Sequence, residues 1–316
     1  MNTYQEENQN LSSGFFIIGF SNTAHPLRLF FFALFCPMYM VTLIGNLLIV
    51  TLTVRDQALH TPMYFFLGSL STVEVGYTLV IVPKMLAGFL VPGSRAISFW
   101  GCATQMYFFV ALGGSECFLL VAMAYDRYVA ICHPLHYASI MSWRARAQLL
   151  LASCAGGFTL ALGLTILVFQ LPFCQSKCVN HVFCDIPAVL ALACGDNFLN
   201  EMALLVACLL ILIFPFLFIL VSYSHILRVV IQSCSAEGRR KAFSTCASHL
   251  TVAVLHYGCA TSMYIRPTAS HSLEQDKLVS LIYINVTPLL YPAIYTLRNK
   301  DFSNALGRVL AWQRYA

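Results

Sequence analysis

Residues 199–230 read LNEMALLVACLLILIFPFLFILVSYSHILRVV, and this stretch decides the fold class of the chain. No Asp, Glu, Lys or Arg lies between Glu201 and Arg228. An α-helix of about 20 apolar residues is long enough to cross the roughly 30 Å hydrocarbon core of a bilayer. The stretch therefore predicts a helix that spans a membrane.

Six further apolar runs of similar length accompany this one. Together the seven occupy residues 27–54, 61–86, 100–128, 147–171, 199–230, 242–264 and 277–297, and no internal repeat relates them. An odd number of spans places the two ends of the chain on opposite sides of the membrane. We therefore expect an all-α membrane protein, a bundle of seven transmembrane helices.

The composition of the whole chain agrees with this architecture. Of its 316 residues, 59% are hydrophobic and 10% are charged, whereas a soluble domain usually has about 25% charged residues. A soluble nucleic-acid-binding protein is therefore excluded. The 13 Cys residues are irregularly spaced and most lie in apolar runs, which excludes a small disulfide scaffold and predicts mostly buried thiols.

The basic residues indicate which end is cytoplasmic, because Lys and Arg concentrate on the cytoplasmic side of membrane proteins. Twelve of the 18 lie on the side of the C-terminal tail: Arg55, Arg127, Arg144, Arg146, Arg228, Arg239, Arg240, Lys241, Arg298, Lys300, Arg308 and Arg314. Six lie on the other side: Arg28, Lys84, Arg95, Lys177, Arg266 and Lys277. We expect the N-terminus outside the cell and the C-terminus in the cytoplasm.

The two ends of the chain differ in character. Residues 1–26 form the expected extracellular tail, whose polar and acidic start predicts no cleavable signal peptide. Asn10-Leu11-Ser12 in this tail fits the glycosylation acceptor pattern. Residues 27–297 form the expected membrane domain. Residues 298–316 alternate apolar and basic residues and predict a cytoplasmic tail with a short amphipathic helix at the inner leaflet.

Two carboxylates, Glu74 and Glu116, lie within the second and third apolar runs at about the same depth. An ionisable group in hydrocarbon costs several kcal/mol, and it usually faces a cavity or the bundle interior. One interpretation is a site for a monovalent cation or a proton, coupled to helix rearrangement. The other is a structural hydrogen bond with one carboxyl protonated, because two like charges this close cannot both ionise easily.

Other polar or helix-breaking residues interrupt the runs. Pro215 and Pro292 free backbone carbonyls in the fifth and seventh helices and permit kinks. His249 and His256 are seven residues apart, on one face of the sixth helix. They could form a proton relay or a metal pair, but no third ligand lies at a matching spacing, which favours hydrogen-bonded interior residues.

The long external gap between residues 172 and 200 is rich in cysteine. It contains Cys174, Cys178, Cys184 and Cys194, and Cys102 lies at the outer end of the third run. One thiol of the five must stay unpaired. A zinc site that includes His181 is one explanation, but disulfides are the simpler way to hold an extracellular loop.

Six segments of the chain, in order, resemble the vertebrate olfactory (odorant) receptors, a branch of the rhodopsin-like (class A) G-protein-coupled receptors. They are LIGNLLIV (43–50), LHTPMYFFLGSLS (59–71), MAYDRYVAICHPLHY (123–137), SY (222–223), KAFSTCASHL (241–250) and PLLYPAIYTLRN (288–299). The triplet Asp126-Arg127-Tyr128 alone is better explained by an arginine that snorkels to the headgroups beside an acidic neighbour. The six ordered segments make the resemblance specific.

The resemblance implies roles for individual residues. It pairs Cys102 with Cys184 and Cys174 with Cys194, which leaves Cys178 unpaired, and it identifies Glu74 and Glu116 with a sodium site. It implies that Asp126 holds Arg127 in the resting state and releases it toward a G protein on activation. The remaining implied activation residues are Tyr128, the inward-moving tyrosines Tyr223 and Tyr295, Lys241 at the start of the mobile sixth helix, and Tyr291 and Pro292 in the seventh.

Two positions depart from the family pattern. Tyr291 stands where the family usually has Asn before the proline of the seventh helix, and His256 stands where an aromatic residue is usual. The Tyr291 departure removes a small amide from the layer between the acidic pair and the cytoplasmic end. We therefore expect altered basal activity or ion binding.

The resemblance also implies the ligand site, in the outer half of the bundle under the long loop. Phe109 occupies the level at which amine receptors of the superfamily place an acidic residue, which favours a small, neutral, lipophilic volatile held by dispersion and by a hydrogen bond to Thr261 or Tyr264. The candidate contacts, on the third, fifth, sixth and seventh helices, are Phe109, Val110, Gly113, Gly114, Ala207, Cys208, Ile211, Tyr257, Ala260, Thr261, Tyr264, Ser280, Leu281 and Ile284.

The function that this resemblance implies is that of an odorant receptor in the plasma membrane of olfactory cilia. A bound volatile would activate a stimulatory, olfactory-type heterotrimeric G protein and raise cAMP, with no cofactor other than sodium at Glu74 and Glu116. A cation channel or transporter that uses the same carboxylates is the alternative, although inverted repeats and a filter sequence are absent. An intramembrane enzyme is disfavoured because HExxH and GxSxG do not occur.

Overall fold

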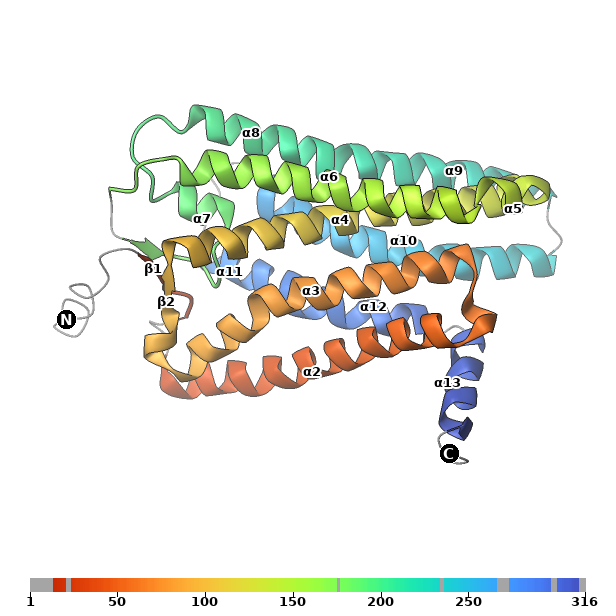
Figure 1. Cartoon of the computed structure of the whole chain (residues 1–316), viewed down its shortest axis with the longest axis horizontal. Helices are drawn as coiled ribbons and strands as arrows, with labels where there is room; N and C mark the ends of the chain where they lie inside the picture. Colours follow the sequence, from red (N-terminus) through yellow and green to blue (C-terminus); the bar gives the residue numbers. More distant parts are fainter. Residues whose placement is uncertain are drawn as a thin grey trace.

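The computed structural model of the chain describes residues 14–20, 24–174, 177–233, 236–265, 273–296 and 300–312. It is a bundle of long helices that run roughly parallel to one another, as Figure 1 shows. This confirms the predicted seven-transmembrane helix fold. Asn10, the predicted glycosylation site, lies outside the described residues, as do Arg298 and Arg314 of the C-terminal tail.

The first four membrane helices are unbroken. They are α2 (His25–Arg55), α3 (Pro62–Leu90), α4 (Phe99–Cys132) and α6 (Trp143–Phe169). The ends of each helix lie within a few residues of its predicted run. Most lie beyond the run, because polar residues at the level of the headgroups can continue a helix after the apolar stretch ends. The short helix α5 (Tyr137–Ile140) follows α4 on the cytoplasmic side.

The fifth and seventh membrane helices each contain a π turn. The fifth consists of α8 (Phe198–Cys208), a π turn at Leu209–Ile213 and α9 (Phe214–Ser233). The seventh consists of α11 (Leu273–Leu281), a π turn at Ile282–Val286 and α12 (Thr287–Thr296). The sixth is α10 (Ala236–Tyr264), which packs against α4, α9 and α12.

A proline follows each π turn at the same offset. Pro215 lacks the N–H that would bond the carbonyl of Ile211, and Pro288 likewise leaves the carbonyl of Ile284 without its helical donor. Both carbonyls belong to the central residue of a π turn, where the helix widens to accommodate the lost bond. The sequence analysis expected an interruption at Pro292, but α12 continues through that residue.

Six of these helices are long and apolar enough to cross a membrane by length and composition alone. The exception among the described helices, α10, spans 29 residues, but it begins with basic residues and has polar residues along its length. Its burial against neighbouring helices compensates for this polarity. On the outer face of the bundle, apolar side chains such as Phe30, Val41, Ile44 and Leu217 remain exposed, as expected where the solvent is lipid.

The helix α13 (Lys300–Trp312) lies across the end of the bundle, nearly perpendicular to α12 and α2 in Figure 1. Phe302 and Ala305 are buried against Ile49, Leu52 and Tyr64. The other face carries Arg308, which donates hydrogen bonds to Asp56 at 2.8 and 2.7 Å. The predicted amphipathic helix is therefore present, with its apolar face on the bundle.

A small sheet that the sequence analysis did not predict covers the extracellular end. Its order is β2-β1-β3, with β1 (Gly14–Ile17) antiparallel to β2 (Ala96–Ser98) and parallel to β3 (Cys178–Val179). Phe15 of the central strand is buried, and its ring packs against those of Phe99, Phe169 and Phe173. The N-terminal segment is therefore part of the folded extracellular cap.

Candidate functional site

A cavity of about 70 Å³ lies in the outer half of the bundle. Its walls are mostly apolar and come from α3, α4, α6, the short loop helix α7 (Ile186–Leu190), the fifth helix, α10 and the π turn of the seventh helix. The lining residues are Tyr77, Phe109, Val110, Gly113, Gly114, Cys117, Leu164, Ile186, Leu204, Ala207, Cys208, Ile211, Leu212, Ala260, Tyr264 and Tyr283. A largely apolar cavity between helices is typical of a small-molecule site.

Nine of the predicted ligand contacts line this cavity. They are Phe109, Val110, Gly113, Gly114, Ala207, Cys208, Ile211, Ala260 and Tyr264. Gly113 and Gly114 differ in the space around them: a Cβ built on Gly113 meets only the Tyr77 ring at 3.6 Å, whereas one on Gly114 meets the backbone of Gly157 at 3.2 Å. Gly113 therefore faces open cavity, and Gly114 sits at a tight helix crossing.

Five predicted contacts do not line it: Tyr257, Thr261, Ser280, Leu281 and Ile284. The Tyr257 hydroxyl donates to the carbonyl oxygen of Cys117 at 2.7 Å, which holds the ring below the cavity. Ser280 donates to the carbonyl oxygen of Asp276 and lies 3.0 Å from His181 Nε2. In the seventh helix the π turn begins at Ile282 and shifts the helical register, so Tyr283 faces the cavity instead.

Some lining residues were missed by the sequence analysis. Tyr77 lies three residues after Glu74 on the same face of α3, so the helical period contained a signal for it. Leu164 on α6 and Ile186 in the loop carried no comparable signal, because their position depends on how the loop folds over the bundle.

The polar end of the cavity is a pair that the sequence did not suggest. Tyr264 donates its hydroxyl proton to Asp185 Oδ1 at 2.8 Å, and the same oxygen accepts from the backbone N–H of Ile186 at 2.9 Å. Burial raises the pKa of Asp185, against the opposing effects of His181 and of the bond from Tyr264. Because its proton is engaged, the Tyr264 oxygen presents acceptor lone pairs to the cavity.

The long loop is fastened to the bundle in several ways. Disulfides join Cys102 to Cys184 and Cys174 to Cys194, the same pairs that the resemblance implies. Gln105 Oε1 accepts from the backbone N–H of Cys184 at 3.0 Å. Cys178 is free and half-buried in β3. The four cysteines in these two disulfides cannot also serve as zinc ligands, which argues against the zinc alternative.

A polar cluster lies below the cavity, in the middle of the bundle. Glu74 and Glu116 are buried, and their carboxyl groups lie close enough to interact with each other, so a proton on one of them would relieve their repulsion. Within the part of the chain that the structure describes, Glu74 Oε2 and Glu116 Oε1 have no hydrogen-bond partner. These two free, buried acceptor atoms fit a small cation such as sodium.

His256 joins this cluster from α10. Its Nδ1 lies 2.7 Å from the Tyr291 hydroxyl and 3.5 Å from Glu116 Oε2, and its Nε2 lies 3.3 Å from Cys117 Sγ. His249 lies about two helical turns before His256 on α10. Its Nδ1 is 2.7 Å from the Tyr223 hydroxyl. Both histidines are therefore hydrogen-bonded interior residues, as the sequence analysis favoured.

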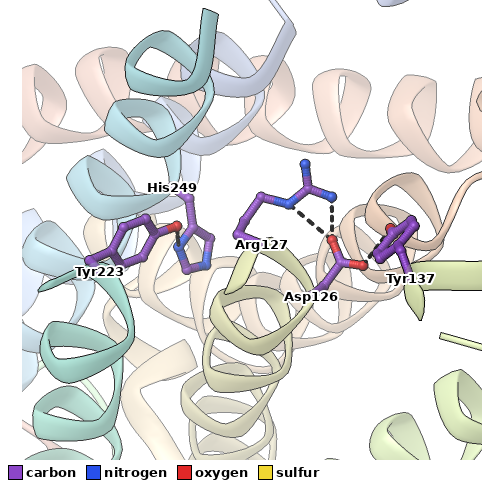
Figure 2. Close-up of polar contacts among 5 residues, drawn as sticks. All are labelled: Asp126, Arg127, Tyr137, Tyr223 and His249. Carbon is purple, nitrogen blue, oxygen red and sulfur yellow. Dashed lines mark hydrogen bonds and ion pairs between the residues drawn. The ribbon is translucent and has the colours of Figure 1, made fainter. Parts of the chain in front are cut away.

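The cytoplasmic end holds the Asp126-Arg127 pair (Figure 2). Asp126 is buried and accepts from Arg127 through Oδ2 and from the Tyr137 hydroxyl, 2.8 Å away, through Oδ1. Tyr223 points toward His249 and not toward Arg127. The contact that the resemblance assigns to the resting state is thus present, with Tyr137 as an additional partner of Asp126.

The other predicted activation residues occupy the same end. The Tyr295 hydroxyl is buried and has no hydrogen-bond partner among the described residues. Tyr128 lies against His133, with its hydroxyl 3.4 Å from Nε2. A Cβ on Gly45 would lie 3.0 Å from Pro292 Cβ, so only glycine allows α2 to approach α12 this closely. Lys241 lies on α10.

Comparison with known proteins identifies the family of this chain. A family profile described as "Olfactory receptor" matches residues 35–313. Olfactory receptor 10R2 of Homo sapiens is 51% identical over 304 residues, which cover 96% of this chain and 90% of that protein. Olfactory receptor 10Z1 of Homo sapiens is 50% identical, over 94% of this chain and 96% of that protein. Olfactory receptor 10J1 of Homo sapiens is 48% identical, over 97% and 95% respectively. These relatives are receptors, not enzymes, and they lend no support to a channel or transporter.

Proposed function

Because the chain belongs to the olfactory receptor family, we propose that it binds a small, mostly apolar volatile in the outer cavity and that binding activates a stimulatory heterotrimeric G protein. It is a multi-pass protein of the plasma membrane. The observation that carries the proposal is the largely apolar cavity under the disulfide-tied loop, at one end of helices whose other end holds Arg127.

The cavity walls favour a neutral ligand. No residue among the described lining residues is charged, so an ionised group would lose its hydration without gaining a partner there. The apolar walls, among them Phe109, Ile211 and Leu212, supply dispersion contacts. The Tyr264 oxygen can accept a hydrogen bond that the ligand donates, and this contact would orient the ligand.

The path from ligand to G protein runs through α10. Tyr264 and Ala260 of α10 line the cavity, His256 contacts the central cluster, and His249 is bonded to Tyr223 of α9. A ligand that contacts one arrangement of α10 better than another shifts the population toward it. Release of Arg127 from Asp126 then offers a cationic side chain to the G protein, and by linkage the bound G protein tightens ligand binding.

Sodium at the central carboxylates is part of this proposal. Glu74 and Glu116 would hold the ion, which would take the place of the shared proton between them. A bound sodium ion would offset one of the two negative charges and lie between the carboxylates, and so would stabilise the arrangement in which α3 and α4 keep them close. Sodium should therefore oppose activation.

The test is cAMP production in cells that express the chain with an olfactory-type stimulatory G protein, across a panel of volatile alcohols, aldehydes, ketones, esters and acids. We expect a response to at least one of these volatiles, lost in Arg127→Ala at unchanged surface expression. Arg55→Ala, which changes an exposed arginine at the cytoplasmic end of α2, is the matched control and should retain the response. Silence across the panel at confirmed surface expression would count against the proposal.

A further inference from the structure

A thiol and an imidazole are in contact at the lower end of the ligand cavity. Cys117 of α4 lines the cavity, and its Sγ lies 3.3 Å from Nε2 of His256 on α10. Both side chains are buried, at 1% exposure each. A basic nitrogen beside a thiol is the arrangement that activates a cysteine as a nucleophile.

The other ring nitrogen of His256 faces oxygen atoms. Nδ1 lies 2.7 Å from the Tyr291 hydroxyl oxygen and 3.5 Å from Glu116 Oε2. Oxygens in these positions, one of them on an acid, favour the tautomer that carries its proton on Nδ1. Nε2 is then the acceptor for the proton of the Cys117 thiol.

A second thiol in the same cavity lacks such a partner. Cys208 lines the cavity from the fifth helix and is buried. Among the described contacts, no histidine lies within hydrogen-bond distance of its sulfur. A thiol without a base in apolar surroundings is inert, because the thiolate is the nucleophile and such surroundings disfavour its charge. Cys117 and Cys208 therefore provide a comparison within one cavity, with and without a base.

The size and the walls of the cavity limit what can reach this thiol. A cavity of about 70 Å³ has room for roughly five water molecules, which corresponds to a small organic molecule. Its apolar walls, among them Phe109 and Ile211, favour an uncharged one. A small ketone or aldehyde with a double bond conjugated to its carbonyl group meets both conditions, and it is an electrophile that thiols attack readily.

We propose that the Cys117 thiol adds covalently to small α,β-unsaturated ketones and aldehydes in this cavity, with His256 as the general base. Cys117 Sγ forms a bond to the β-carbon, and the electron pair of the carbon–carbon double bond shifts toward the carbonyl oxygen. The thiol proton passes to His256 Nε2 and then to the α-carbon, as the carbonyl double bond forms again. No group leaves, and no external oxidant or reductant is needed, so the thioether product contains every atom of both partners.

This inference deepens the proposed function, on which it rests for the entry of volatiles into the cavity. It adds a chemical class to the ligands and a second mode of binding. A saturated volatile would leave as its concentration falls, whereas an unsaturated one would stay attached until the thioether bond breaks.

The test is covalent labelling of the full chain in nanodiscs, with butenone as the reactive probe. Butanone, which has the same carbon skeleton without the double bond, is the unreactive control. Digestion and mass spectrometry at successive times give the labelling rate of each cysteine in one sample. We expect the thioether to form about a hundredfold faster at Cys117 than at Cys208, the lower range of what a general base contributes. Equal rates at the two thiols would overturn the proposal.

His256→Phe removes the base and keeps a ring. It should lower the Cys117 rate about a hundredfold and leave the Cys208 rate unchanged, so that Cys208 reports whether the cavity is intact in each sample. His256→Gln, which is polar but has no basic nitrogen, should give the same result if His256→Phe does not fold. His249→Gln is the matched control on the same helix and should label as the unchanged chain does. A wild-type Cys117 rate in either His256 variant would disprove the role of the base.

Gly113→Leu tests the route to the thiol, because Gly113 lines the cavity four residues before Cys117 on the same face of α4. It should slow labelling of both cavity thiols. Gly258→Leu, where an added Cβ meets no atom within 4 Å, should not. An unchanged Cys117 rate in Gly113→Leu would mean that butenone arrives from outside the cavity, contrary to the proposal.

The labelling experiment needs no G protein, so its failure can be told apart from failure of the proposed function. A receptor that is labelled at Cys117 in the expected way but gives no cAMP response to any volatile would support this site and count against the proposed function. A receptor that responds to saturated volatiles but forms no thioether at Cys117 would contradict this site alone.

Discussion

His256 Nδ1 lies 2.7 Å from the hydroxyl oxygen of Tyr291, so one hydrogen bond joins the two positions at which the sequence departs from the family pattern. Both side chains are buried, at 1% and 2% exposure. Each substitution taken alone places an unusual polar group inside the bundle. Together they satisfy each other and connect α10 to α12, so the two departures are a matched pair.

This pairing predicts non-additive effects on basal activity. Tyr291→Phe and His256→Phe each remove the bond and with it about 1 kcal/mol of the restraint between α10 and α12. We expect each to raise ligand-independent cAMP by about fivefold or less, the shift that corresponds to that free energy. In the double mutant the increase should be smaller than the product of the two single effects, because the second change removes a bond already lost. Multiplicative effects would show that the bond does not act on the equilibrium.

The Tyr137 hydroxyl predicts a second contribution to the resting state. It donates to Asp126 Oδ1 at 2.8 Å, on the side of the carboxylate opposite Arg127. Tyr137→Phe should loosen Asp126 and raise basal cAMP, but by less than Asp126→Asn, which also removes the charge that holds Arg127. Measurement at matched surface expression checks the order. A Tyr137→Phe receptor with basal cAMP equal to or above that of Asp126→Asn would contradict it.

Gly113 allows a direct test of the ligand cavity. It lines the cavity, and the nearest atom to an added Cβ is 3.6 Å away, so a larger side chain can enter without disturbing the fold. Gly113→Leu should fill the space and raise the half-maximal concentration of an agonist at least tenfold, most for the largest volatiles. Gly258→Leu on α10 is the control, since nothing lies within 4 Å of its added Cβ. An unchanged dose–response curve in Gly113→Leu would place the ligand elsewhere.

The crossing of α4 and α6 predicts a stability effect. A Cβ on Gly157 would lie 2.5 Å from the carbonyl oxygen of Ala111 and 2.6 Å from the backbone nitrogen of Ser115. Because these are backbone atoms, the helices must separate. Gly157→Ala should therefore lower the free energy of unfolding by about 1–3 kcal/mol, as thermal unfolding in nanodiscs would show. Gly163→Ala lies on the same helix with no neighbouring atom within 4 Å and should be neutral; equal melting temperatures of the two variants would refute the packing argument.

The docking of α13 should depend on pH. Asp56 accepts from Arg308 and from the backbone N–H of Ala58, and these bonds hold its pKa below the ordinary value of 3.8. A pKa lowered by folding contributes stability above the unfolded value, and this is lost as the pH falls through the folded value. Hydrogen exchange of residues 300–312, corrected for intrinsic rates, should therefore be slow at neutral pH and accelerate below about pH 3.8. Arg308→Gln should show a smaller pH effect, and an identical profile would disprove the assignment.

The sequence predicted the membrane helices closely because the hydrocarbon core imposes a simple condition on length and polarity. The third run was expected at residues 100–128, and α4 spans Phe99–Cys132. The sequence also predicted that Glu74 and Glu116 would meet, since both carboxylates lie at one depth and need an interior partner.

Other features depend on contacts between distant segments and left no local pattern. Asp185 lies in a loop, and its bond to Tyr264 follows from how two disulfides place that loop. Tyr283 lines the cavity and Ile284 does not because a π turn shifts the helix there, and the proline associated with that turn is Pro288 and not the predicted Pro292. The four residues of β1 have too short a pattern to distinguish a strand from a tail.

The central position of β1 has a consequence for biosynthesis. This strand leaves the ribosome first, yet its neighbour β2 follows the second membrane helix and β3 follows the fourth. Until those segments have crossed the membrane, Phe15 and Phe16 have no partners and remain in the lumen as an exposed apolar strand. Closure of the cap is therefore a late step of insertion, and a nascent receptor whose long loop misfolds would present this same strand to the lumenal chaperones.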